Sequence, residues 1–104
     1  MQVSVEICLV PIGVGVSVSP YVATCQRVLE QAGLTGQLHA YGTNVEGDWD
    51  VVMRAVKACH EAVHAQGAPR IFTTLKVGTR TDRKQALADK IRSVEDRLAS
   101  APDA

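Results

Sequence analysis

Two histidines four residues apart form the pattern in this sequence that most directly suggests chemistry. The segment His60-Glu61-Ala62-Val63-His64 has the H-E-x-x-H spacing. On a helix this spacing places two imidazoles on one face as zinc ligands, with the glutamate as general base. Taken alone, the segment would indicate a metallopeptidase.

The surrounding helix pattern argues against a peptidase. The apolar stripe of this helix centres on Val52, Cys59 and Val63, so the two histidines lie on its flank or in solvent. No third ligand is evident in the sequence, and the chain is short for a catalytic cleft. We expect no functional metal site, while incidental zinc binding by the surface pair stays open.

A second polar cluster surrounds a predicted β-hairpin. Thr43, Asn44 and Glu46 supply a hydroxyl, an amide and a carboxylate within four residues, and Gly42 and Gly47 leave the backbone accessible. Such convergent polar groups can orient a small molecule. The alternative for the glutamate is an exposed hairpin charge, because an isolated carboxylate is a weak signal.

Three further side chains are candidates for the same site. Trp49, the only tryptophan, begins the next helix and is either a stacking partner or a lid on the core. Glu6 is predicted in mid-strand, where an unpaired charge is costly, so it pairs with Lys76 or faces a ligand or solvent at an interface. Ser17 precedes a helix start that favours an anion or a hydroxyl; a flexible connector is the alternative.

Hydrophobic periodicity predicts the elements that carry these residues. Alternation predicts strands over residues 3–9, 37–41, 43–46 and 70–79, with Gly42 in the tight reversal of the hairpin. Three- and four-residue spacing predicts helices over residues 19–32 and from residue 48 to just before Gly67. A last helix carries an apolar face, and the tail from Ala99 is expected to fray.

Helix ends are marked by particular residues. Ser19 and Asp48 are the expected N-caps of the first two helices, and Thr81 or Asp82 that of the last. Gly33 is placed to take the left-handed conformation that ends the first helix.

The order of these elements predicts one α+β domain over residues 1–104. Strand, helix, strand, strand, helix, strand is the ferredoxin-like βαββαβ arrangement, here with an additional C-terminal helix. Its four-stranded antiparallel sheet has helices on one face only. The other face is half apolar, which suits packing against a second subunit with a polar pocket between them; it is predicted to carry Ser4, Glu6, Cys8, Val10, Phe72, Thr74 and Lys76.

Composition excludes several classes of function. Eleven basic and eleven acidic residues give no net charge, so there is no footprint for nucleic acid or an anionic membrane. No apolar run reaches the roughly 18 residues that span a bilayer, and no signal peptide is recognisable. Cys8, Cys25 and Cys59 form no C-x-x-C pair. We expect them to be small buried side chains in a protein that resides in a reducing compartment. We therefore expect a cytoplasmic protein. We also expect it to form a homo-oligomer, because the hydrophobic core of a chain of this length is modest and subunit contacts would add to its stability.

Five segments in order resemble a known family. PIGVGVSVSPYV at 11–22, GTNVEG at 42–47, GAPRIFTT at 67–74, RTD at 80–82 and KIRSV at 90–94 are similar to the thiamine-binding UPF0045 family, also called the MTH1187/YkoF-like family. The resemblance covers nearly the whole chain. It implies a ferredoxin-like subunit, assembly into dimers or tetramers through the sheets, and binding of thiamine or its hydroxymethylpyrimidine part without a demonstrated reaction.

The resemblance also directs attention to a ligand set. Thiamine carries a cationic thiazolium and an aminopyrimidine, so its site needs a carboxylate or paired acceptors and an apolar or aromatic platform. At position 41 a tyrosine stands where the family pattern usually has methionine, which alters the shape and polarity of the pocket. The candidate ligand-binding residues are Thr43, Asn44, Glu46, Trp49, Ser17, Glu6 and Tyr41.

Three classes of function follow in order of preference. The first is a small-molecule binding protein that needs no cofactor. The second is a ferredoxin-like regulatory or interaction module that senses another metabolite or a partner protein. The third, an enzyme, is disfavoured because no nucleophile stands in an obvious position beside a base.

Overall fold

The structure is a computed structural model that describes residues 1–100 of the chain. Its elements are β1 (Gln2–Ile12), α1 (Ser19–Gln31), β2 (Gln37–His39), β3 (Gly42–Asp48), α2 (Trp49–Ala65), β4 (Arg70–Gly78) and α3 (Leu87–Ala99). The tail that was predicted to fray falls largely on residues 101–104, which lie outside the described residues.

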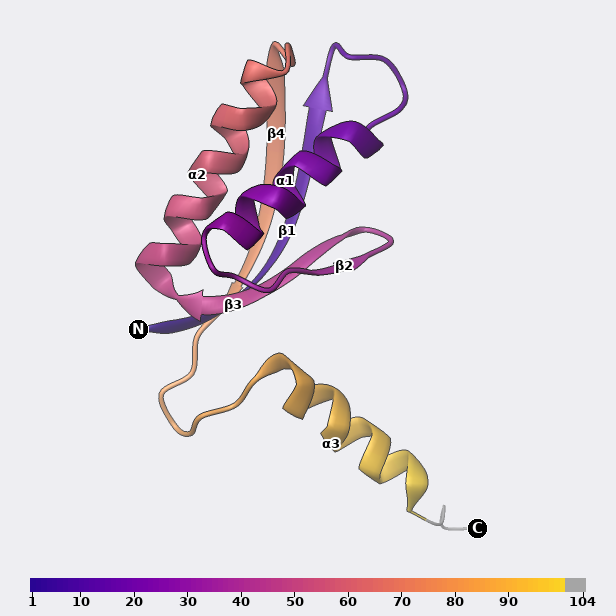
Figure 1. Ribbon diagram of the computed structural model, residues 1–104. Helices are drawn as coiled ribbons and strands as arrows, with labels where there is room; N and C mark the ends of the chain where they lie inside the picture. The colour runs from indigo at the N-terminus through magenta and orange to yellow at the C-terminus, as the bar shows by residue number, and fades with distance from the viewer. Residues whose placement is uncertain (101–104) are drawn as a thin grey trace.

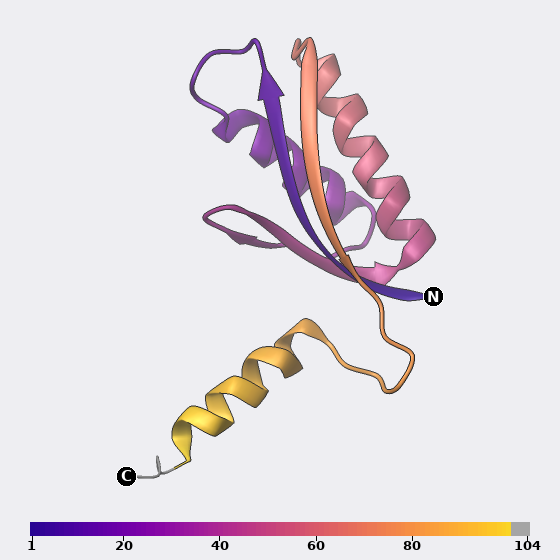
Figure 2. The same cartoon turned by 180° about the vertical axis from the view of Figure 1, so that it is seen from behind.

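The four strands form one antiparallel sheet in the order β2-β3-β1-β4. Helices α1 and α2 both cover the same face (Figure 1), and the opposite face is left uncovered by helices (Figure 2). This is the predicted ferredoxin-like α+β fold with an additional C-terminal helix. Within residues 1–100 no helix combines the length and the apolar character that crossing a membrane requires.

The core lies between the sheet and its two helices. Val3 and Val5 on β1 and Val45 on β3 are almost completely buried, because alternate residues of a strand point to the same face. Leu29 on α1 and Val63 on α2 meet them from the helices. The period-two and helical patterns therefore predicted both sides of this core correctly.

Several helix ends confirm the local sequence signals. The Asp48 carboxylate accepts a hydrogen bond from the Asp50 backbone amide at 3.2 Å and caps α2. Gly33 and Gly67 have φ angles of 76° and 102° just beyond α1 and α2, a conformation that glycine adopts without the penalty of a Cβ atom. Both glycines end their helices as predicted.

Two predicted N-caps are wrong. Val18, not Ser19, is the N-cap residue of α1, and Ser19 is already helical. Helix α3 begins at Leu87 rather than beside Thr81 or Asp82. Asp82 instead pairs with Arg80, so its carboxylate is not available to cap a helix.

The predicted position of the hairpin turn is also wrong. The reversal between β2 and β3 lies at residues 40–41, and Gly42 is the first residue of β3. A Cβ atom on Gly42 would stand 2.7 Å from the Ile7 carbonyl oxygen. Gly42 is therefore needed for the close approach of β3 to β1 rather than for a left-handed turn.

The cysteines divide into two environments. Cys25 and Cys59 are buried as predicted, whereas Cys8 is only half buried, on the uncovered face of the sheet. The Cys59 thiol lies 3.8 Å from the Cys25 carbonyl oxygen. Interaction with the Cys25 side chain and burial raise the pKa of the Cys59 thiol, so Cys59 remains a protonated core residue.

Helix α3 stands apart from the rest of the chain (Figure 1). The radius of gyration is 16.3 Å, compared with about 13 Å for a compact domain of this length. The apolar side chains of α3, Ile91, Val94 and Leu98, are 51%, 57% and 77% exposed. The additional helix thus presents an apolar stripe that its own subunit does not bury.

Candidate functional site

A row of polar side chains crosses the uncovered face of the sheet. Asn44 on β3, Glu6 on β1 and Lys76 on β4 are direct cross-strand neighbours. Nε2 of His39 on β2 lies 3.1 Å from the Asn44 side-chain oxygen and 3.5 Å from the Glu6 carboxylate. Glu6 therefore lies against His39, which the sequence did not suggest as its partner, and no ion pair with Lys76 is among the contacts of residues 1–100.

Glu46 occupies the next row of the same face. It pairs across the strands with Ser4 on β1, which in turn pairs with Gly78 on β4. One oxygen of the Glu46 carboxylate accepts a hydrogen bond at 3.0 Å from the backbone amide of Leu87, the first residue of α3. This contact joins the sheet to the C-terminal helix.

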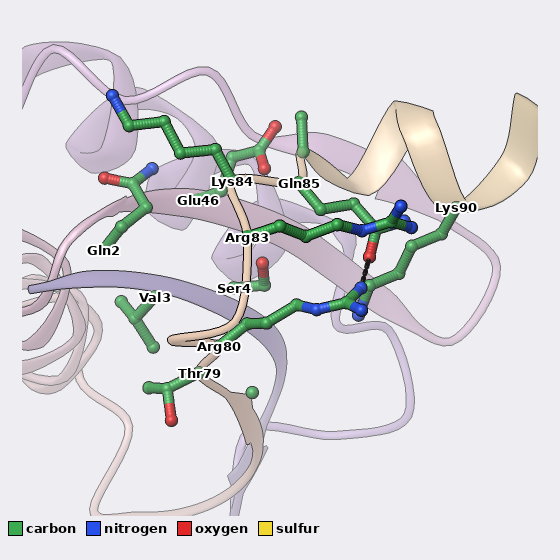
Figure 3. A pocket seen from close by; sticks show the side chains of 12 residues that line it. Gln2, Val3, Ser4, Glu46, Thr79, Arg80, Arg83, Lys84, Gln85 and Lys90 are labelled. Atoms are coloured by element: carbon green, nitrogen blue, oxygen red, sulfur yellow. Dashed lines mark hydrogen bonds between the residues drawn. The ribbon is translucent and has the colours of Figure 1, made fainter.

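A cavity of about 540 Å³ opens beside Glu46. Its floor is the end of the sheet, and its outer wall is the linker between β4 and α3 (Figure 3). The volume falls in the range of about 300–1,000 Å³ typical of small-molecule pockets. The polar and charged residues that line it are Gln2, Ser4, Glu46, Thr79, Arg80, Arg83, Lys84, Gln85 and Lys90.

A second cavity, also of about 540 Å³, lies on the other side of Glu46. It is formed by the loop that leads from α1 to β2, together with Asn44 and the first turn of α3. Glu46 lines both cavities. A ligand in either one would meet the same carboxylate.

The linker wall is held by an ion pair. The guanidinium of Arg80 contacts both carboxylate oxygens of Asp82, at 2.6 and 2.8 Å, and also binds Gln85. The hydrogen bonds from Arg80 lower the pKa of Asp82 to about 2. They also raise the pKa of Arg80.

The hairpin cluster that the sequence suggested is divided between two faces. Asn44 and Glu46 lie on the uncovered face, but Thr43 points to the helices, is 6% exposed and accepts a hydrogen bond at 2.8 Å from Gln26. A smaller cavity of about 300 Å³ borders Thr43 and Tyr41 on the helix side of the hairpin and is lined mainly by aliphatic residues. Tyr41 itself is 86% exposed.

The two remaining candidates line neither of the cavities beside Glu46. Trp49 is the first residue of α2 and packs, half buried, against the hydrophobic core. Ser17 is exposed in the loop between β1 and α1.

The H-E-x-x-H histidines lie on the flank of α2, as the helix pattern predicted. His60 hydrogen-bonds to Thr73 on β4 at 2.6 Å, and His64 to the Ala68 carbonyl at 2.8 Å. Their ring centres are 6.3 Å apart. Within residues 1–100 no group of three or more metal-ligating side chains comes together.

The basic residues of the linker were not predicted as site residues. Arg83 and Lys84 stand nearly forty residues after Glu46 in the sequence, and only the fold brings them to the same cavity. The one available signal was their clustering directly after the last strand, beside Arg80.

Comparison with known proteins assigns the chain to a family. A family model described as thiamine-binding protein matches residues 5–95. A UPF0045 protein of Synechocystis sp. is 61% identical over 101 residues, which make up 97% of this chain and 84% of the relative.

Solved structures agree with the fold. A hypothetical protein from Methanocaldococcus jannaschii has a TM-score of 0.83 at 30% identity, covering 91% of this chain and 97% of that one. A Thermotoga maritima protein named for a suggested role in thiamine biosynthesis or salvage has a TM-score of 0.77 at 19% identity, covering 90% and 99% of the two chains; this similarity concerns the fold alone. From the family match and the sequence identity, the chain belongs to the thiamine-binding protein family, whose UPF0045 members it resembles along nearly its whole length.

Proposed function

We propose that this protein binds thiamine or its hydroxymethylpyrimidine moiety at Glu46, on the uncovered face of the sheet. The observation that carries the proposal is the position of this carboxylate between two cavities of ligand size. The family match supports a small-molecule role.

The chemistry of the site suits an aminopyrimidine. The ring presents an amino donor beside ring nitrogens, and a carboxylate is a strong acceptor for such a donor. Glu46 supplies that acceptor, and the Asn44 side chain adds an amide in the second cavity. The carboxylate also offsets the positive charge of the thiazolium.

A second copy of the chain is proposed to cover the site. At the far end of the uncovered face Val10 and Phe72 are cross-strand neighbours and are 44% and 57% exposed. Apolar area of this kind, next to a polar row, is typical of an interface between subunits. The apolar stripe of α3 is likewise left exposed by its own subunit and could be buried by a second copy. We therefore propose that the protein is a homodimer or homotetramer.

Binding without catalysis is the proposed activity. Ser4 and Thr79 are the hydroxyl side chains that line the cavity beside Glu46, and the described lining contains no histidine or cysteine to activate either of them. We infer a binding protein in the cytoplasm, without a cofactor of its own.

Isothermal titration calorimetry with thiamine and with hydroxymethylpyrimidine tests this function. Glu46→Gln keeps an oxygen that can accept the Leu87 amide but removes the charge, so the affinity is expected to fall about tenfold or more. Glu61→Gln, on the exposed side of α2, is the matched control and should bind like the parent.

Two outcomes would overturn the proposal. Unchanged binding by Glu46→Gln would place the ligand elsewhere, with Thr43→Val then testing the smaller cavity. No binding of either compound by a folded oligomer would favour the regulatory or interaction module instead.

A further inference from the structure

We propose that the cavity beside Glu46 contains an anion subsite, formed chiefly by Arg83 and Lys90, and that the preferred ligand is a phosphate ester of the thiamine class. This inference rests on the proposed function and names the form of the ligand. Its basis is the unequal distribution of charge around one cavity.

The cavity is strongly basic although the whole chain is neutral. Arg80, Arg83, Lys84 and Lys90 line it, and Glu46 is its one acidic lining residue among residues 1–100. The chain as a whole has equal numbers of acidic and basic residues. Four of its eleven basic side chains are thus gathered at one cavity.

These cations differ in how far they are already neutralised. Arg80 is held in a two-point ion pair by Asp82. In the described part of the chain, Arg83, Lys84 and Lys90 have no carboxylate within 4.0 Å. None of these three positive charges is held in a direct ion pair, and Asp82 acts on Arg83 only at longer range, so all three can contribute to binding an anion.

The side chains also differ in direction. Figure 3 shows Arg80, Arg83 and Lys90 extending to the same side of the linker, whereas Lys84 runs in the opposite direction. Arg83 comes from the linker and Lys90 from α3, so two elements supply the unpaired charges on that side. An arginine offers several donors in a fixed plane, and a lysine adds a point charge, a combination suited to phosphate.

Charge balance favours an ester over the free vitamin. Thiamine alone is a cation, and the excess of basic groups in the cavity weakens the attraction that Glu46 exerts on it. A phosphate group carries about −1.5 to −2 charges near neutral pH, which outweighs the thiazolium charge. Glu46 at one wall and the basic groups at another would then bind opposite ends of one molecule.

Calorimetry with thiamine, thiamine monophosphate and inorganic pyrophosphate tests the subsite. In the parent protein the monophosphate is expected to bind about tenfold more tightly than thiamine, with an affinity that falls as salt rises. Pyrophosphate is expected to compete with the monophosphate. The double variant Arg83→Gln/Lys90→Gln should bring the monophosphate to the affinity of thiamine.

Matched controls separate this subsite from charge in general. Arg54→Gln/Lys57→Gln removes two exposed positive charges from α2 and should leave the preference for the ester unchanged. Circular dichroism of each variant checks that it is folded.

The outcomes distinguish the two proposals. Equal affinity for thiamine and its monophosphate in the parent, or a preference that survives in Arg83→Gln/Lys90→Gln, overturns the anion subsite and leaves thiamine binding standing. If the parent protein binds neither thiamine nor thiamine monophosphate, the subsite is overturned together with the proposed function.

Discussion

The carboxylate of Glu46 on β3 accepts a hydrogen bond at 3.0 Å from the backbone amide of Leu87, 41 residues later in the chain. The first amides of a helix have no partner within it, so this side chain satisfies one of them from the sheet. Glu46 thereby has two tasks, to hold the start of α3 and to face two cavities. Ligand binding at Glu46 is for this reason expected to be linked to the position of α3.

Replacing Glu46 separates these tasks. Glu46→Ala removes the acceptor, so the Leu87 amide should lose about 1 kcal/mol of protection and exchange with deuterium roughly fivefold faster. Glu46→Gln retains an acceptor oxygen and should keep most of that protection. Hydrogen exchange followed by NMR measures both; equal protection of Leu87 in the parent and in Glu46→Ala would contradict the bond.

The Arg80–Asp82 ion pair predicts an acid-dependent linker. Because the pKa of Asp82 is lowered from 3.8 to about 2 in the folded chain, the pair stabilises the fold above about pH 4, and this contribution is lost as the pH falls from about 4 to 2. In Arg80→Gln the pKa of Asp82 should return toward 3.8. Carboxyl ¹³C chemical shifts titrated from pH 6 to pH 1.5 report the value directly.

A control for this titration lies on α3. Arg92 pairs with Asp89 at 3.1 Å, so Arg92→Gln removes a similar charge without touching Asp82. Its Asp82 titration should match that of the parent. An Asp82 pKa near 3.8 in the parent protein would show that the ion pair does not persist in solution.

Gly42 and Gly78 offer a matched test of strand packing. A Cβ atom at Gly42 would lie 2.7 Å from the Ile7 carbonyl oxygen, whereas at Gly78 the nearest atom, the Ser4 carbonyl oxygen, is 3.9 Å away. Gly42→Ala should therefore lower the free energy of unfolding by about 1–3 kcal/mol, and Gly78→Ala should change it little. Urea denaturation at one protein concentration compares them, and equal midpoints would refute the predicted clash.

The apolar stripe of α3 predicts dependence of assembly on that helix. Ile91→Asp/Val94→Asp places two charges on side chains that are 51% and 57% exposed within one subunit, so a folded but smaller species should appear in light scattering after size-exclusion chromatography. Ser93→Asp adds a charge to an exposed position outside the stripe and should leave the mass unchanged. A parent protein that runs as a monomer at working concentration would remove the basis for a subunit covering the sheet.

Local patterns in the sequence predicted most of the architecture. The alternation along β1, the stripe of α2, the Asp48 cap and the glycines after α1 and α2 were all identified correctly. Each of these features depends on residues within a few positions of one another, because strand and helix periodicity and helix capping are set by local backbone geometry. The ferredoxin-like order followed from the sequence of elements.

Competition between neighbouring groups explains why the start of α3 was predicted wrongly. Asp82 has the chemistry of an N-cap, but Arg80 two residues earlier holds its carboxylate. Helix α3 starts later, where the Asp89 carboxylate accepts the Ala86 amide at 2.9 Å. The position of the hairpin turn was predicted wrongly for a different reason. Gly42 lies in β3 because the absence of a Cβ atom allows close approach to the Ile7 carbonyl on β1. No local sequence pattern reveals this contact between strands.

The sequence by itself determined which segments are strands and helices, and it indicated Glu46 as a candidate ligand-binding residue. Only the tertiary structure decided its surroundings. Thr43 lies on the helix side of the sheet, and Glu6 lies against His39. Arg83 and Lys90, which follow Glu46 by 37 and 44 residues in the sequence, line the same cavity as Glu46. The reason is physical: periodicity sets the direction of each side chain from its own backbone, whereas the meeting of distant side chains depends on strand register and on the path of the linker after β4.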